Sequence, residues 1–230
     1  MVVENYNMIK KQVEECARAC GRNPDDITLI AVSKTKPLSD IEELIPIGVK
    51  DFGENKVQEL CNKYENVSKP VNFHLIGHLQ TNKVKYVVDK ACMIHSVDSI
   101  KLAKEIQKEA AKKNIISQIL IEVNVAEEDS KFGLHVEEVI PFVEQVAVYP
   151  NVHINGLMTI APFVENAEEN RHYFRILKQL SLDITSKNID NISMNVLSMG
   201  MTNDYKVAIE EGATMLRVGT AIFGERNYSK

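Results

Sequence analysis

The feature that most constrains the fold of this chain is a repeated exchange between two kinds of segment. Short apolar runs, typical of strands buried on both faces, are followed by segments whose apolar residues recur at helical spacing. The strand-like runs cover residues 28–33, 50–53, 72–76, 92–96, 118–125, 152–158, 194–197 and 214–218. Alternating strands and helices predict a parallel sheet with right-handed crossovers, and eight such units favour closure into a (β/α)8 TIM-type barrel.

One further helix is expected in front of the barrel, over residues 4–20, with Gly21 ending it. Little chain follows the eighth strand, so this helix is expected to cover the gap beside that strand or the floor of the barrel. We expect one domain over residues 1–230, with the barrel from about 28 to 224. The rival is an open doubly wound sheet. Its dinucleotide fingerprint G-x-G-x-x-G is missing after the first strand, where the chain reads SKTKP.

Capping patterns predict where three of the later helices begin. Ser39 and Glu42 form an S-x-x-E capping box in front of one helical segment. Asp98 and Thr202 stand at the start of two other segments, and each has a side chain that can accept a hydrogen bond from a first-turn N–H group. The segment that starts at Thr202 is expected to continue to Glu211.

Composition narrows the class of protein and its partners. With 44% hydrophobic and 26% charged residues over 230 positions, the chain can bury one large core. Its net charge of -5 argues against nucleic acid as a partner. There is no signal pattern and no apolar run near the roughly 18 to 20 residues that span a bilayer, so we expect a cytoplasmic protein without a membrane partner. Cys16, Cys20, Cys61 and Cys92 are scattered, and we expect reduced thiols and no metal site.

The loops after the seventh and eighth strands carry small and hydroxyl residues. In a barrel of this kind function lies where strands end, and these two loops are the common phosphate site. The first reads SMGMTND, with Ser198 and Gly200, and the second reads RVGTAIFG, with Gly219 and Thr220. The pattern indicates a phosphate cradle of hydroxyls and closely approached backbone N–H groups. Two ordinary turns built from small residues are the alternative.

Lys34 stands at the end of the first strand, in the sequence LIAVSKTKP. Because side chains alternate along a strand, Lys34 shares a face with Ile30 and Val32, and on the inner face its amine would rise from the core into the mouth of the barrel. Lys36 lies beyond the strand, next to Pro37. Two solvated charges that close a strand are the alternative. A reactive lysine opposite a phosphate cradle predicts pyridoxal phosphate (PLP) held as a Schiff base.

The motifs themselves resemble a known family, the pyridoxal phosphate homeostasis proteins. The matching motifs are AVSKTKP, FGENKVQE, HLIGHLQTNK, EEDSKFGL, GLMTI, LSMGMTND and LRVGTAIFG, in order from about residue 28 to residue 224. The resemblance implies a barrel like the N-terminal domain of alanine racemase. It also implies that Lys34 carries PLP. The other implied site residues are Arg217 on the side of the pyridine nitrogen, Ser198, Gly219 and Thr220 around the phosphate, and Asn55 and Met199 along the ring. Lys36 and Lys131 are implied as assisting lysines, with His78 as a further secondary residue.

Two classes of function fit this resemblance. In the first, the protein holds PLP for intracellular homeostasis with little or no turnover and no catalytic residue, as a monomer that supplies PLP-dependent apoenzymes. In the second, it is an amino-acid racemase-like enzyme. Barrel-type racemases resemble it but have a second, β-rich domain, whereas this sequence stops soon after the eighth strand. A racemase also needs a second base. The candidates His74, His78 and Tyr205 are expected to be structural, and a Schiff-base aldolase without PLP is disfavoured by the motifs.

Overall fold

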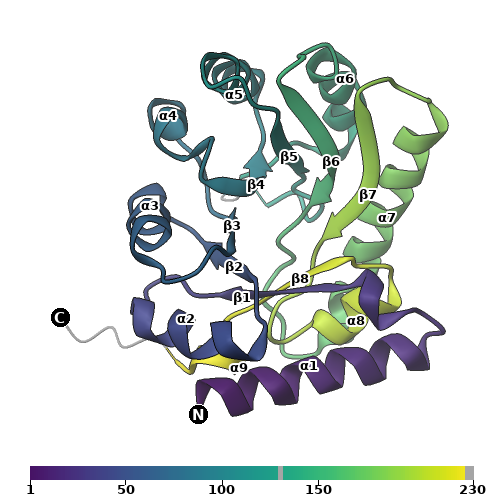
Figure 1. Ribbon diagram of the computed structural model, residues 1–230. Helices are drawn as coiled ribbons and strands as arrows, with labels where there is room; N and C mark the ends of the chain where they lie inside the picture. Colours follow the sequence, from purple (N-terminus) through teal and green to yellow (C-terminus); the bar gives the residue numbers. More distant parts are fainter. Residues whose placement is uncertain (129–131, 226–230) are drawn as a thin grey trace.

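The computed structural model describes residues 1–128 and 132–225. Eight parallel strands in these ranges pair in chain order and close on themselves, with the first strand hydrogen-bonded to the last. Helices surround this ring of strands, as Figure 1 shows. The predicted (β/α)8 barrel is therefore confirmed, and the open doubly wound sheet is wrong.

The elements follow the predicted exchange of strands and helices. The strands are β1 (Thr28–Val32), β2 (Asp51–Glu54), β3 (Asn72–Leu75), β4 (Ala91–Val97), β5 (Ser117–Glu122), β6 (Val152–Met158), β7 (Ile192–Ser198) and β8 (Met215–Val218). The α-helices are α1 (Val2–Ala19), α2 (Leu38–Leu44), α3 (Val57–Asn66), α4 (Val84–Val87), α5 (Ile100–Lys112), α6 (Val136–Val146), α7 (Arg171–Ser186), α8 (Tyr205–Glu210) and α9 (Thr220–Phe223). Short 3-10 helices are η1 (Pro24–Asp26), η2 (Ile45–Ile47), η3 (Thr81–Lys83) and η4 (Ala167–Asn170).

All three predicted helix starts are wrong, each by one to three residues. Helix α2 follows Pro37, whose fixed φ suits a helix entry, so Ser39 already lies inside the helix. Ser99 rather than Asp98 caps α5, because the Ser99 hydroxyl accepts the N–H of Leu102. Asp204 rather than Thr202 precedes α8. The observed caps lie one or two residues from the predicted ones, so composition alone does not choose between neighbouring caps.

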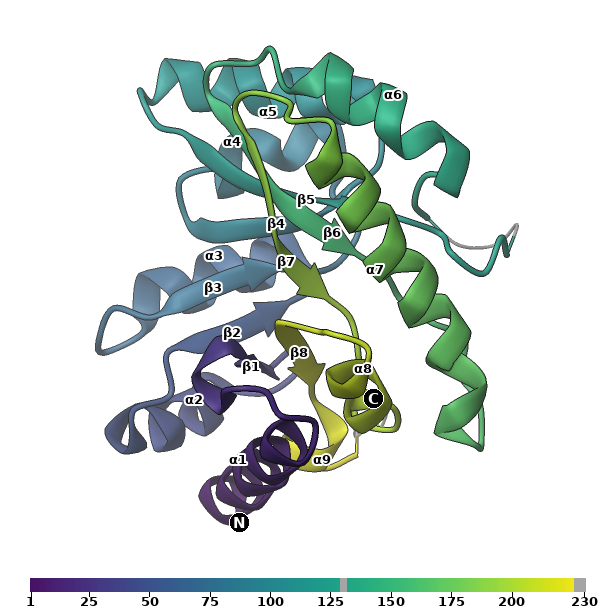
Figure 2. The same cartoon turned by 90° about the vertical axis from the view of Figure 1, so that its right-hand side faces the viewer.

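Helix α1 lies beside β8, after which the described residues form the four-residue helix α9. It packs on α8 and α9 along one edge of the barrel, as Figures 1 and 2 show. Asn5 donates to the carbonyl of Ile222 at 3.0 Å, and the Tyr205 hydroxyl donates to Gln12 at 2.6 Å. The N-terminal helix thus covers the gap beside the eighth strand, which is one of the two predicted positions.

Alternate residues of the strands point into the barrel. A β-carbon at Gly53 would lie 3.1 Å from both Cγ2 of Ile30 and Cδ1 of Ile76, so these two side chains meet at the inner face of β2. Val32 shares this face, as predicted from strand alternation. Glu54, one residue after Gly53, points the other way and contacts α3. The inner face of β1 therefore leads from Ile30 to Lys34.

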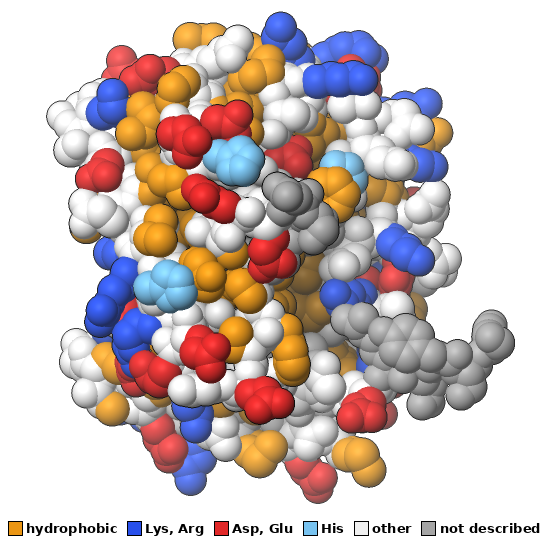
Figure 3. All heavy atoms as spheres, turned by 180° about the vertical axis from the view of Figure 1, so that it is seen from behind, with side chains coloured by type: hydrophobic (Ala, Val, Ile, Leu, Met, Phe, Trp, Pro, Cys, Tyr) orange, Lys and Arg blue, Asp and Glu red, His pale blue; other side chains and the backbone are white. Residues whose placement is uncertain are grey.

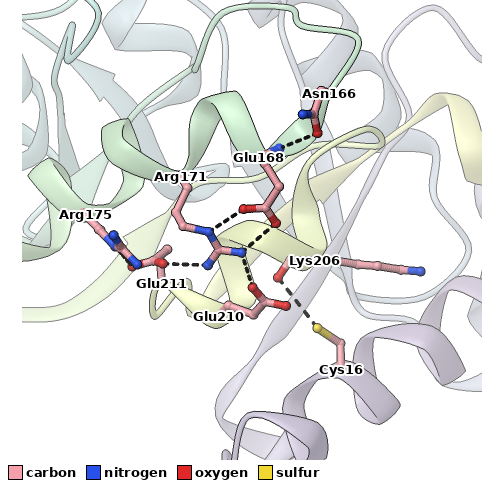
Figure 4. Close-up of polar contacts among 8 residues, drawn as sticks. All are labelled: Cys16, Asn166, Glu168, Arg171, Arg175, Lys206, Glu210 and Glu211. Carbon is pink, nitrogen blue, oxygen red and sulfur yellow. Dashed lines mark hydrogen bonds and ion pairs between the residues drawn. The ribbon is translucent and has the colours of Figure 1, made fainter.

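Arg171 fastens the start of α7 to the end of α8. Its guanidinium contacts Glu168 at 2.7 Å, Glu211 at 2.7 Å, and Glu210, and Glu211 also accepts from Arg175 at 3.0 Å, as Figure 4 shows. Networks of several charges are held better than isolated surface pairs. This one anchors the end of the segment that runs from β6 to α7 across the barrel mouth.

Over the described ranges, none of the helices is both long enough and apolar enough to cross a bilayer.

Candidate functional site

A cavity of about 730 Å³ opens where the strands end. In Figure 2 the arrows of β6 and β7 point towards this side, and Figure 3, seen from behind, shows a hollow with hydrophobic side chains in it. The volume lies in the range that encloses a small cofactor. Seven sequence-predicted residues line it: Lys34, Lys36, Asn55, His78, Arg217, Gly219 and Thr220. Folding thus brings together residues from four different strand ends, namely those of β1, β2, β3 and β8.

Lys34 enters the cavity from a constrained turn directly after β1. The next residue, Thr35, has a φ of 64°, which is rare for a β-branched residue and costs of order 1–3 kcal/mol. Its N–H donates to the carboxylate of Glu59 on α3 at 2.6 Å. The surrounding structure therefore imposes the conformation of this turn.

Behind that turn lies a buried ion pair. The Lys63 ammonium contacts Glu54 at 2.7 Å and Glu59 at 2.8 Å, and it donates to the carbonyl of Ser33 at 2.8 Å. The Ser33 hydroxyl donates to Glu54 at 2.6 Å. Burial raises the pKa of Glu54, although Lys63 and Ser33 act in the opposite direction. Helix α3 thus holds both residues that flank Lys34 in the chain.

Arg217 approaches the cavity from the inner face of β8 and is almost fully buried. Its guanidinium donates to the Ser198 hydroxyl at 2.6 Å and to the Thr159 carbonyl at 2.7 Å. Burial lowers its pKa to about 10, while Asp204 and Glu122 act to raise it. At neutral pH it is still a cation, so it presents a fixed positive charge and N–H donors.

Glu122, at the end of β5, lines the cavity and was missed in the sequence. Its oxygen Oε2 is buried and lacks a hydrogen-bond partner among the described residues. Burial and the neighbouring Asp98 raise its pKa to about 7, and Arg217 acts in the opposite direction. The available signal was a carboxyl between Ile121 and Val123 at the end of a strand. An unpartnered buried acid that faces a cavity is a group poised to bind a ligand.

Replacing Glu122 by Gln is expected to change how stability depends on pH. The folded-state pKa of about 7 exceeds the ordinary 4.5, so the carboxyl favours folding at low pH and that contribution is lost as pH rises to 7. A shift of this size corresponds to about 3 kcal/mol at pH 8. In ligand-free protein, Glu122→Gln should raise the free energy of unfolding most at pH 8 and progressively less towards pH 5.

Urea denaturation at both pH values measures this difference. Glu165→Gln, which changes an exposed carboxylate, is the matched control and should give a small and pH-independent effect. A gain for Glu122→Gln of the same size at pH 5 and pH 8 would contradict the assigned ionisation.

The opposite wall of the cavity is built from close backbone packing and an aromatic contact. A β-carbon at Gly77 would lie 2.5 Å from the Asn55 carbonyl oxygen, so only glycine lets the loop after β3 approach Asn55 this closely. The His78 ring stacks on Phe132, with centroids 3.9 Å apart. Both rings line the cavity.

Three predicted residues lie elsewhere or in other roles. Met199 is fully buried in the hydrophobic core and does not line the cavity, so its expected contact along a ring stays a prediction. Ser198 lies behind Arg217 and contacts it, rather than lining the cavity itself. Lys36 borders the cavity but its ammonium donates to the carbonyls of Phe223 and Glu225, at 2.8 and 3.0 Å. Lys131 lies outside the described residues.

The three candidate second bases differ in their position relative to the cavity. His74 is buried inside the barrel, where it contacts His95 and Asp51. The Tyr205 hydroxyl points away to Gln12 on α1. Of the three, His78 is the one that lines the cavity.

Cys16, Cys20 and Glu210 form a separate group at the junction of α1 and α8, with one potential ligand atom of each within 4.8 Å of the others. Figure 4 shows that the Glu210 carboxylate is already engaged by Arg171, and that Cys16 donates to the carbonyl of Lys206 at 3.7 Å. We assign no metal to this group.

Comparisons with known proteins show the family to which the chain belongs. Residues 5–227 match the model of the alanine racemase N-terminal domain. The pyridoxal phosphate homeostasis protein of Aquifex aeolicus is 44% identical, over 98% of this chain and 98% of its own. The solved structure of PipY from Synechococcus elongatus, with PLP bound, has a TM-score of 0.86 at 30% identity and covers 97% of this chain and 100% of its own. An alanine racemase of Clostridium difficile, at 12% identity and a TM-score of 0.78, shares the fold; the match covers 99% of this chain and 58% of the racemase. The chain therefore belongs to the family of pyridoxal phosphate homeostasis proteins, which is built on the alanine racemase N-terminal domain.

Proposed function

We propose that this protein binds pyridoxal 5'-phosphate as a Schiff base on Lys34 and holds it for vitamin B6 homeostasis, with little or no turnover. The observation that carries the proposal is the convergence of Lys34 and Arg217 on one cavity of about 730 Å³, beside the Gly219–Thr220 turn. Support comes from the Aquifex aeolicus relative, which is named for pyridoxal phosphate homeostasis, and from PipY, which has PLP bound.

The residues present fit this cofactor. The cavity has the volume for a small aromatic phosphate. Its wall carries an amine, a buried guanidinium and an unpartnered carboxyl oxygen of Glu122, which is the donor and acceptor set that such a molecule needs. Pyridoxal phosphate supplies an aldehyde that an amine captures and a ring that withdraws electrons.

Each residue then has a distinct task. Lys34, held by its constrained turn, provides the amine for covalent attachment. Gly219 and Thr220 offer backbone N–H groups and a hydroxyl suited to phosphate, as expected for the loop after the eighth strand of a barrel. Arg217 remains charged and therefore disfavours protonation of a ring nitrogen placed next to it. A ring left unprotonated is a weaker electron sink, which suits storage better than turnover.

The test is made on the purified protein. We expect a yellow protein whose cofactor, after borohydride reduction, is found by mass spectrometry on the peptide that contains Lys34. A protein that binds no PLP, or carries it on another lysine, would sink the proposal.

The alternative is a racemase-like enzyme, and the position of His78 in the cavity wall is the observation that favours it. A racemase requires a base on the far side of the substrate from the lysine. Incubation of the PLP-loaded protein with L-alanine in deuterated water separates the two. We expect no sustained exchange at the α-carbon, and exchange that His78→Phe abolishes would establish the enzyme instead.

A further inference from the structure

A chain of buried hydrogen bonds runs through the barrel from Arg217 to the opposite end. Arg217 donates to Ser198 Oγ at 2.6 Å, and Ser198 Oγ lies 3.0 Å from His95 Nδ1. His95 Nε2 lies 3.0 Å from His74 Nδ1, and His74 Nε2 lies 3.1 Å from Asp51 Oδ1. Asp51 begins β2, and its side chain is 27% exposed. The cavity wall is thus connected to the far end of the barrel.

The two ends of this chain determine where its hydrogens lie. A guanidinium only donates and an ionised carboxylate only accepts. Burial would raise the pKa of Asp51, but hydrogen bonds from His74 and Asn72 outweigh it and hold that pKa below its ordinary value. The carboxylate is therefore ionised at neutral pH, and His74 donates to it from Nε2.

The remaining directions follow from one proton on each imidazole. A neutral His74 that donates from Nε2 accepts at Nδ1, so His95 donates from Nε2 and accepts at Nδ1. The acceptor at His95 Nδ1 takes the hydroxyl hydrogen of Ser198. The Ser198 oxygen then remains to accept from Arg217, and every polar atom of the two imidazoles has a partner.

The direction of these hydrogen bonds matters for Arg217, because the two groups that accept hydrogen bonds from its guanidinium are neutral. They are the Ser198 hydroxyl and the Thr159 carbonyl, whereas a buried cation is stable only when its charge is compensated. Hydrogen bonds that all point the same way polarise one another, so Ser198 becomes a better acceptor when the chain ends on a carboxylate. Asp51 thereby contributes to the stability of a charge at the other end of the barrel.

We propose that Asp51, His74 and His95 are positioning residues that act through Ser198 to hold the Arg217 guanidinium in one orientation in the cavity wall. A second proton on His74 reverses the chain. His74 then donates from Nδ1, His95 must accept at Nε2 and donate from Nδ1, and Ser198 receives two donors while its own hydrogen loses its acceptor. The geometry of the hydrogen bonds carries this proposal; only its effect on cofactor binding rests on the proposed function.

Other titratable groups face this chain from each packed element. Lys50 precedes Asp51 and acts on its pKa. Burial and Asp51 raise the pKa values of Tyr6 on α1 and Cys92 on β4 to about 12, so both remain neutral below pH 8. His95 is also kept neutral, because burial, His74 and Arg217 lower its pKa well below the ordinary value.

The hydrogen positions can be tested without any cofactor. Nitrogen-15 NMR distinguishes imidazole tautomers, and spectra of His74→Gln and His95→Gln assign the two signals. At pH 8 we expect both rings as the Nε2–H tautomer. On acidification His74 should become doubly protonated while His95 changes to the Nδ1–H tautomer at the same midpoint. His95 found with its proton on Nδ1 at pH 8, or a His95 tautomer that ignores the titration of His74, would overturn the proposal.

The consequence for the site is tested by the pH dependence of PLP affinity. In the wild type we expect affinity to fall on acidification as the chain reverses. Asp51→Asn removes the carboxylate at which the hydrogen-bond chain ends, so the midpoint of this fall in affinity should move to lower pH. Asn155→Ser, which removes a 2.8 Å hydrogen bond to Gln118 between β5 and β6 and touches no member of the hydrogen-bond chain, is the matched control and should leave the midpoint in place.

The variants and the wild type share the cofactor phosphate and the side chains of Glu122, His78, Asp98 and Asp204. A difference between their midpoints therefore does not come from these groups. An unchanged midpoint in Asp51→Asn, or an equal shift in Asn155→Ser, would overturn the proposal. If Asp51→Asn does not fold, His74→Gln is measured in its place. In that variant the fall in PLP affinity that depends on the hydrogen-bond chain should be absent. A wild type that binds no PLP would defeat the proposed function alone, because the tautomer measurement still decides the hydrogen-bond chain.

Discussion

Replacing Lys34 by Ala is expected to abolish covalent attachment of PLP. The cavity wall would keep Arg217 and the Gly219–Thr220 turn, so some binding without a covalent bond should persist. The yellow absorbance and the borohydride-trapped label should both disappear. Lys34→Arg is a stricter test of the same point. Its guanidinium keeps the positive charge but does not lose a proton, so it cannot form the Schiff base.

Lys36→Ala is the matched control for this experiment. Lys36 also borders the cavity, but its ammonium is held by the carbonyls of Phe223 and Glu225. Stoichiometric trapping should therefore survive in Lys36→Ala, with a weaker anchor for the segment after α9. Equal trapping in Lys34→Ala and the wild type would show that another lysine is the carrier.

Replacing Lys63 by Met is expected to cause the largest loss of stability, about 3–5 kcal/mol, because it leaves the Glu54 carboxylate buried without its partner. Lys63 contacts Glu54 at 2.7 Å, and both side chains are almost fully buried. The change also removes a donor to the Ser33 carbonyl and frees Glu59, which holds the Thr35 N–H. Denaturation in urea measures the first effect, and a slower or incomplete trapping of PLP on Lys34 would report the second.

Two further variants isolate the cause of this loss. Lys187→Met breaks an exposed pair with Glu144 at 3.1 Å and should cost under about 1 kcal/mol. Adding Glu54→Gln to Lys63→Met should restore part of the stability, since the uncompensated charge is then gone. A loss in Lys63→Met no greater than that in Lys187→Met would show that the buried pair does not support the Lys34 turn.

Most of the architecture could be predicted from local patterns. The eight strand-like runs, the early helix and the shared face of Ile30, Val32 and Lys34 each depend on periodicity within a few residues. Helix starts were less predictable, because Ser99 and Asp204 compete with nearby residues of similar capping ability.

Some residues of the cavity could likewise be predicted from local patterns and others could not. Lys34, Gly219 and Thr220 lie at strand ends, where the fold itself implies function. Glu122 was missed because a single carboxyl in an apolar run has the same appearance whether it faces water or a cavity. Met199 lies in the hydrophobic core although its neighbours in the motif line or support the site, and the motif alone does not reveal this difference.

The sequence alone therefore determined the barrel, the family and the lysine at the end of the first strand. Tertiary structure decided what lies beneath that lysine and behind Arg217: the pair of Glu54 with Lys63, and the line from Ser198 through His95 and His74 to Asp51. The physical reason is range. Periodicity reports which face of its own element a side chain occupies, but a hydrogen bond between residues as far apart in the chain as His95 and Ser198 depends on how the strands are staggered when the barrel closes.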